Sequence, residues 1–218
     1  FVGFFLHIWL YSDCGKTVKT MSRSSHCFGI EDELFDKRVP LNGQITKREI
    51  RALSISYLHI GTNTVLWDIG SATGSVAIEA SRIATQGKII AIEKDRDSLP
   101  LLQANVAKHK ANNVEIVEGT APQILKDLES PDSVFIGGTG GELSSIITSS
   151  IDRLFKGGSI VMNFASIERS IKAYNLIKQN RMEPGYLSIN ISKGKELVDN
   201  SLVLTPLNPV FIVYGRKQ

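Results

Sequence analysis

The sequence predicts an α/β fold with a seven-stranded, mostly parallel sheet, on three observations. Residues 65–69 are an apolar run containing β-branched residues, the pattern of a buried strand. The run breaks at Gly70 and Gly74 and resumes as a helical pattern from Val76. Apolar runs and helical patterns then alternate almost to the C-terminus, which favours a sheet covered by helices on both faces. Such sheets bind ligands at the carboxyl ends of their strands.

The later elements follow from the same patterns. We expect strands at residues 88–93, 114–118, 133–136, 159–163, 186–192 and 209–214. Helices are expected at residues 97–110, 142–155 and 166–179, with a short one after residue 122. No helical pattern separates the last two strands, so they should pair as a hairpin-like antiparallel end, with Lys193 and Lys195 in the connecting loop.

A helix should also precede the first strand. Thr46 and Glu49 have the spacing of a capping box, and Ile45 and Ile50 that of the accompanying hydrophobic staple. The helix should end at residues 61–63. Arg48 and Arg51 lie off its apolar face, so both are expected in solvent, with ligand contact as the less favoured alternative.

Composition indicates an ordinary globular chain. Its 218 residues are 42% hydrophobic and 22% charged, enough for one well-buried domain, which we place at residues 31–218. A net charge of +3 does not favour nucleic acid as a partner and is compatible with an anionic small molecule. The two cysteines, Cys14 and Cys27, allow neither a disulfide framework nor a zinc site, so we expect no metal and a reducing, cytoplasmic location.

The first 30 residues read as an extension that is disordered or not native. Residues 1–11 are apolar and aromatic but too short to span a bilayer, so no membrane association is expected. Met21 would be a natural start. A targeting peptide is the alternative, since lysines, an arginine and serines follow the apolar run.

The first glycine turn resembles a cofactor motif. A dinucleotide fingerprint counted from Gly70 would need glycine at positions 72 and 75, which are Ala72 and Ser75. The S-adenosylmethionine pattern of class I methyltransferases is similar to D-x-G-x-G-x-G, and Asp68, Gly70 and Gly74 match it. Glu93 ends the second strand, where a carboxylate can accept hydrogen bonds from both ribose hydroxyls. A doubly wound domain with another ligand, or none, is the alternative.

A second glycine cluster follows the fourth strand. Four glycines flank Thr139 at residues 137–141, before a helix, although a plain turn needs far fewer. In this fold the loop faces the transferred methyl group, and exposed N–H groups there suit an anion such as a carboxylate. A flexible tight turn is the alternative. The Asp/Asn-Pro-Pro-aromatic motif common in methyltransferases that act on amino groups is missing here, which weakens nucleic-acid methylation.

Together these motifs resemble the decarboxylating precorrin-6B methyltransferases of cobalamin biosynthesis. The resemblance covers residues 29–218 and rests on five segments: residues 45–51, 68–74, 118–122, 137–143 and 208–210. The sequence departs from the family at Ala72, where Gly is common, and at Ser71, where Cys or Ala is common. The implied fold is a Rossmann-like, seven-stranded sheet of the class I methyltransferase type, with the last strand antiparallel.

The resemblance also implies a site and a reaction. Cofactor contacts for S-adenosylmethionine are expected at Thr46, Gly70, Ser71, Ala72, Thr73, Gly74, Glu93 and Ala121. The reaction would methylate ring carbon 15 and remove the carboxyl group of the acetate chain on carbon 12. Candidates for binding the carboxylates of this anionic tetrapyrrole are Gly138, Thr139, Gly140, Gly141, Lys193 and Lys195, with Arg48 a weaker one. No catalytic residue is assigned, because positioning of an activated sulfonium can supply most of the rate.

Several alternatives stay open at this stage. The acceptor could be another small molecule or a tRNA base, or the chain could be an inactive, methyltransferase-like binding subunit. The family resemblance further implies a homo-oligomer and, in some organisms, a partner methyltransferase that acts on ring carbon 5. The sequence does not decide whether the substrate carries cobalt.

Overall fold

The computed structural model describes residues 29–38 and 45–218 and contains a seven-stranded sheet in the order β3-β2-β1-β4-β5-β9-β6. Neighbouring strands from β3 to β5 pair in parallel, whereas β9 is antiparallel to both β5 and β6. The predicted sheet with an antiparallel last strand is therefore confirmed. The strands of this sheet are β1 (Val65–Ile69), β2 (Lys88–Glu93), β3 (Val114–Glu118), β4 (Ser133–Ile136), β5 (Ser159–Phe164), β6 (Glu183–Ile189) and β9 (Val210–Arg216).

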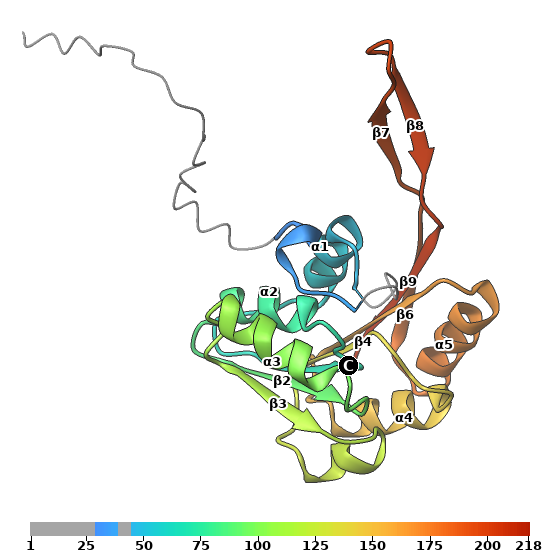
Figure 1. The fold of residues 1–218 in the computed structure, drawn as a ribbon. Coiled ribbons are helices and arrows are strands. Elements are labelled where there is room, and N and C mark those ends of the chain that lie inside the picture. Colours follow the sequence, from blue (N-terminus) through green and yellow to red (C-terminus); the bar gives the residue numbers. More distant parts are fainter. Residues whose placement is uncertain (1–28, 39–44) are drawn as a thin grey trace, which may run out of the picture.

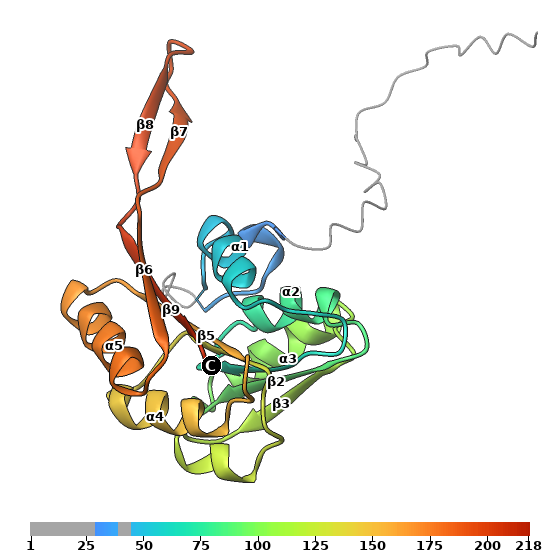
Figure 2. The same ribbon diagram turned by 180° about the vertical axis from the view of Figure 1, so that it is seen from behind.

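Helices cover both faces of the sheet (Figures 1 and 2). One apolar cluster joins the sheet to α1, α2 and α3, and another joins it to α4, α5 and a 3-10 turn, η3. Strand side chains alternate between the two clusters, as in Ile89, Ile90, Ala91 and Ile92 of β2. The helices are η1 (Asp32–Leu34), α1 (Arg48–Tyr57), α2 (Ser75–Ile83), α3 (Leu99–Lys108), η3 (Gln123–Asp127), α4 (Leu143–Arg153) and α5 (Ile167–Gln179).

The predicted capping box at the first helix is wrong. α1 has Lys47 as its N-cap residue, and no side chain caps it. The Glu49 carboxylate instead forms an ion pair with Lys193, whose Nζ lies 3.0 Å from Oε1. A long-range charge contact has thus replaced the local one, and the helix ends at Tyr57, before the predicted stop.

Arg51 is not in solvent, as its position on the helix had suggested, but completely buried. Its Nε donates to Glu79 at 2.7 Å, and Nη1 donates to Asp32 at 3.1 Å. Nη1 also donates to the Thr46 carbonyl, and Nη2 donates to the Ile30 carbonyl. The guanidinium thereby joins the N-terminal segment, α1 and α2, and its charge is compensated by two buried carboxylates.

The backbone just before the predicted domain is held by Glu79 of α2. The backbone N–H groups of Gly29 and Ile30 donate to Glu79, each at 2.8 Å, and the Ile30 side chain is buried. The predicted extension covers residues 1–30, and its residues 1–28, with Cys14, Met21 and Cys27, lie outside the described residues. Within residues 29–38 and 45–218, no helix has the length and apolarity to cross a membrane.

The chain between β6 and β9 forms a two-stranded arm that the sequence analysis did not predict. It consists of β7 (Ser192–Glu196) and β8 (Leu202–Pro206), and both views show it projecting away from the sheet (Figures 1 and 2). Lys193 and Lys195 therefore lie on a strand rather than in a loop. The preceding strand, β6, covers residues 183–189 instead of 186–192. Five large apolar side chains of the arm are exposed, namely Leu197, Val198, Leu202, Val203 and Leu204.

Candidate functional site

The first glycine turn connects β1 to α2 and depends on left-handed backbone at three positions. Gly70 has φ 73°, Ala72 has φ 49° and Gly74 has φ 76°. Glycine adopts these angles without a steric cost, whereas alanine does not. The N–H groups of Gly70 and Ser71 donate to the Ile92 carbonyl at 2.9 and 3.2 Å, so the turn is fixed against the end of β2.

Asp68 holds the turn from beneath. Its Oδ2 accepts hydrogen bonds from Ser71 Oγ at 2.7 Å and from the Ala77 N–H at 3.1 Å. Burial raises the pKa of this carboxyl group from 3.8 to about 6; the two hydrogen bonds lower it, and the nearby Glu93 raises it. The carboxylate therefore links the start of the turn to the first turn of α2, where N–H groups have no partner within the helix.

Glu93 ends β2 beside the same turn. One of its oxygens, Oε1, accepts from the N–H groups of Lys94 and Asp95 at 2.9 and 2.8 Å. The other, Oε2, accepts from the Ala72 N–H at 2.9 Å. A carboxylate oxygen can accept two hydrogen bonds, so Oε2 keeps acceptor capacity toward the cavity that Glu93 lines.

The second glycine cluster packs directly on the first turn. A Cβ atom added at Gly70 would lie 2.8–2.9 Å from the N, Cα and O atoms of Gly138. A Cβ at Gly137 would lie 3.2 Å from the Gly70 carbonyl oxygen. Gly140 and Gly141 have φ 53° and 102°. The cluster is therefore explained by backbone contact between two loops and by left-handed backbone, rather than by flexibility.

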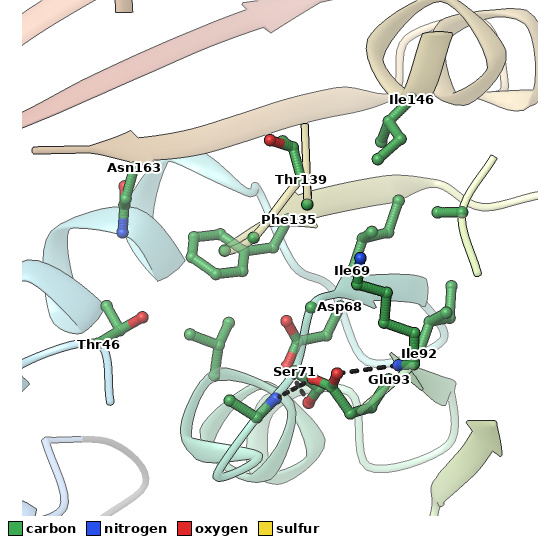
Figure 3. A pocket seen from close by; sticks show the side chains of 18 of the residues that line it. Thr46, Asp68, Ile69, Ser71, Ile92, Glu93, Phe135, Thr139, Ile146 and Asn163 are labelled. Atoms are coloured by element: carbon green, nitrogen blue, oxygen red, sulfur yellow. Dashed lines mark hydrogen bonds between the residues drawn. The ribbon is translucent and has the colours of Figure 1, made fainter. Parts of the chain in front are cut away.

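The two loops border a cavity of about 490 Å³ at the carboxyl ends of the parallel strands (Figure 3). This volume lies in the range of small-molecule sites. Figure 3 shows Thr139 across the cavity from Glu93 and Ser71, with Thr46 and Asn163 at one side. Phe135 and Ile146 contribute apolar side chains to the wall of the cavity.

Most predicted site residues line this cavity, and five do not. Those that line it are Thr46, Gly70, Ser71, Ala72, Glu93, Ala121, Gly138, Thr139 and Gly140. Those outside its lining are Thr73, Gly74, Gly141, Lys193 and Lys195. A Cβ at Gly74 would lie 2.4 Å from Leu102 Cδ1, so this glycine serves helix packing. Thr73 is buried, and its carbonyl accepts from Asn105 at 2.9 Å.

Several polar residues of the cavity wall were not predicted as site residues, among them Lys47, Lys94 and Asn163. Lys94 follows Glu93, and Asn163 lies near the end of β5, where its Nδ2 lies 2.9 Å from Ser54 Oγ. Lys94 and Asn163 could have been predicted from their positions in the sequence, because each lies at the carboxyl end of a predicted strand, where such sheets bind ligands. Among the described residues, no group of three His, Cys, Asp or Glu side chains could hold a metal ion.

Comparison with known proteins agrees with this architecture. A family model described as "Precorrin methyltransferase domain" matches residues 38–213. A protein of Sulfurisphaera tokodaii named "Probable cobalt-precorrin-6B C(15)-methyltransferase (decarboxylating)" is 39% identical over 193 residues, covering 87% of this chain and 97% of the relative.

Solved structures give the same grouping. The crystal structure of precorrin-6y C5,15-methyltransferase from Geobacter metallireducens has a TM-score of 0.82 and 36% identity, covering 88% of this chain and 100% of the other. An SAM-dependent O-methyltransferase from Thermotoga maritima has a TM-score of 0.67 and 16% identity, covering 80% of this chain and 66% of the other. At that identity the likeness shows the shared class I fold alone.

Proposed function

The chain belongs to the precorrin methyltransferase family, and from this premise we propose that it methylates carbon 15 of precorrin-6B or its cobalt form. The same reaction would release the acetate carboxyl group on carbon 12 as carbon dioxide. The observation that carries this proposal is the cavity where two interlocked glycine loops meet a strand-end glutamate. The relatives named for this reaction match nearly their full length.

S-adenosylmethionine is the cofactor that the family implies, and the residues present fit it. Glu93 Oε2 can still accept a hydrogen bond from a ribose hydroxyl. Where Gly70 and Gly138 meet, the cavity is bordered by backbone atoms without side chains. We assign Glu93 to the ribose and Gly70, Ser71 and Ala72 to the methionine side of the cofactor. Thr46 and Ala121 border the same space. When bound, this cofactor supplies an activated methyl group on a sulfonium.

The protein's contribution is then to hold the two reactants in line and to exclude water. Alignment of reacting atoms at about 3–3.5 Å can supply about 7–11 kcal/mol of the barrier. Asn163 is suited to orient a ligand, because Ser54 Oγ contacts both the nitrogen and the oxygen of its amide and so fixes the side chain at the cavity wall. Decarboxylation requires electrons to flow into the macrocycle, so the protein must chiefly orient the acetate chain.

The reaction is tested by incubating the protein with S-adenosylmethionine and precorrin-6B, with and without cobalt, and recording mass spectra. The expected product gains one methyl group and loses one carboxyl group. Unchanged substrate, with cofactor binding intact, would redirect the proposal to another acceptor. Failure to bind the cofactor as well would favour a binding subunit.

The cofactor assignment has its own matched pair of variants. Glu93→Ala should weaken binding of S-adenosylhomocysteine by about tenfold or more, because charged acceptors contribute strongly to hydrogen bonds. Glu118→Ala is the control, since Glu118 is the register partner of Glu93 on β3 but is paired with Arg96 outside the cavity. Equal affinities for both variants in calorimetry would contradict the assignment.

We also propose that the chain assembles with copies of itself through the β7–β8 arm. An isolated two-stranded hairpin is marginally stable in water, and this one exposes Leu202 and Leu204 at 71% and 70%. Light scattering should report an oligomer whose mass falls when both leucines are changed to lysine. A monomeric native protein would refute this proposal.

A further inference from the structure

Two cations approach the second glycine loop from different parts of the chain. Lys94 follows β2, and Arg169 lies in the first turn of α5. Both are exposed residues. Neither forms an ion pair with a carboxylate among residues 29–38 and 45–218. This differs from Lys193, whose charge is paired with Glu49.

Lys94 lies directly over Gly140. A Cβ atom added at Gly140 would be 2.3 Å from Lys94 Nζ and 3.0 Å from Cε. The space that any other residue at position 140 would fill is therefore occupied by the lysine side chain. Both Lys94 and Gly140 line the cavity, so the ammonium group stands at its wall.

Arg169 contacts the residue before Gly140 in the same loop. Its Nη2 donates to Thr139 Oγ1, and Thr139 is a buried residue that lines the cavity. A guanidinium group has five N–H donors, and the contact of Arg169 with Thr139 uses only its Nη2 nitrogen. The remaining donors suit a bidentate carboxylate.

Among the described residues, the acidic side chains of the same region form no ion pair with Lys94 or Arg169. Glu93 accepts three backbone N–H groups, and Asp68 lies buried beneath the first turn. Glu142, at the start of α4, accepts from Ser145 at 3.0 Å. Lys94 and Arg169 therefore present positive charge at the loop without an ion-pair partner in the part of the chain that the structure describes.

We propose that Lys94 and Arg169 anchor two carboxylates of the substrate at the loop formed by residues 137–141. This inference rests on the proposed function, because a polycarboxylate acceptor is what two such cations would recognise. It replaces Lys193 and Lys195 as the expected substrate contacts and assigns the glycine loop a second task. Gly140 makes room for the lysine, and Thr139 fixes the arginine.

The test compares Lys94→Gln, Arg169→Gln and the double variant in steady-state kinetics with precorrin-6B. We expect KM for the tetrapyrrole to rise about tenfold in each single variant and further in the double variant. The affinity for S-adenosylhomocysteine should stay within about twofold, and Arg169→Lys should recover part of the loss. Added salt should raise KM in the native protein more than in the double variant.

Lys156→Gln is the matched control, because Lys156 is exposed and precedes β5 at the opposite end of the strands. The proposal is overturned if both single variants keep the native KM, or if Lys94→Gln weakens cofactor binding alone. Binding of uroporphyrin, an octacarboxylate, followed by fluorescence, separates this proposal from the proposed function. Should the native protein fail to convert precorrin-6B, weaker uroporphyrin binding by the double variant would still support the anion site, and equal binding would refute it.

Discussion

Gly70 and Gly138 meet backbone to backbone, so the loops after β1 and β4 are one interlocked unit. The contact leaves no room for a side chain at position 70, where a Cβ atom would lie 2.8–2.9 Å from three backbone atoms. Since β1 and β4 are neighbours in the sheet, their loops leave at the same edge. The pairing of β1 with β4 therefore fixes the relative position of the two loops that border the cavity.

Gly70→Ala should destabilise the protein more than a positive φ alone would. Gly157 provides the control, since it has φ 83° and no atom within 4 Å of its added Cβ. We expect Gly157→Ala to cost about 1 kcal/mol of unfolding free energy, from backbone strain. Gly70→Ala should cost about 1–3 kcal/mol more, through the clash with Gly138. Urea denaturation measures both, and equal losses would show that the two loops separate readily.

Ala72 occupies a left-handed position at φ 49°, which costs alanine more than glycine. Ala72→Gly should therefore raise the unfolding free energy by up to about 1 kcal/mol, because strain is relieved. Ala104→Gly, at an exposed position in the middle of α3, should lower it by about 1 kcal/mol. Thermal unfolding should therefore show a higher Tm for Ala72→Gly and a lower Tm for Ala104→Gly than for the native protein. A loss of stability in both variants would mean that the turn bears no strain at Ala72.

Arg51→Met should cost about 3–5 kcal/mol, because Glu79 would remain buried without its cation and Asp32 would keep only Lys47, at 3.8 Å. Arg48→Met, in the same helix but exposed, should change stability by less than about 0.5 kcal/mol. Chemical denaturation compares the two arginines directly. If Arg51→Met is as stable as Arg48→Met, the buried ion pairs do not hold the N-terminal segment.

The fold could be predicted from sequence because its signals are local. Apolar runs placed the strands, and the missing helix before β9 placed its antiparallel pairing. The two glycine clusters and Glu93 were likewise readable, since strand ends of a parallel sheet share one edge. These features needed no knowledge of distant contacts.

The errors arose where distant residues decide the outcome. Arg51 looked solvated by helical spacing, yet Glu79 and Asp32, 28 and 19 residues away, make its burial possible. Glu49 fits a capping box but pairs with Lys193 across the fold. The arm was hidden because β7 has a polar sequence, and Lys94 was hidden because a lone lysine carries no motif. The place of Lys94 at the cavity follows from its contact with Gly140, which only the folded structure shows.

The pKa of about 6 at Asp68 predicts that the folded protein loses stability as pH rises. Because the folded pKa lies above the unfolded value of 3.8, the native state binds more protons between these limits. This group therefore contributes a penalty that grows from about pH 4 to about pH 6 and reaches roughly 3 kcal/mol.

Asp68→Asn removes that penalty while its amide oxygen can still accept from Ser71 and Ala77. Urea denaturation at several pH values should show a smaller decline in the variant between about pH 4 and pH 6, with Asp199→Asn as an exposed control that leaves the decline unchanged. Parallel curves for native protein and Asp68→Asn would mean that the carboxyl group is ionised at low pH and that the turn stabilises its charge. In that case the two hydrogen bonds outweigh burial at the base of the site.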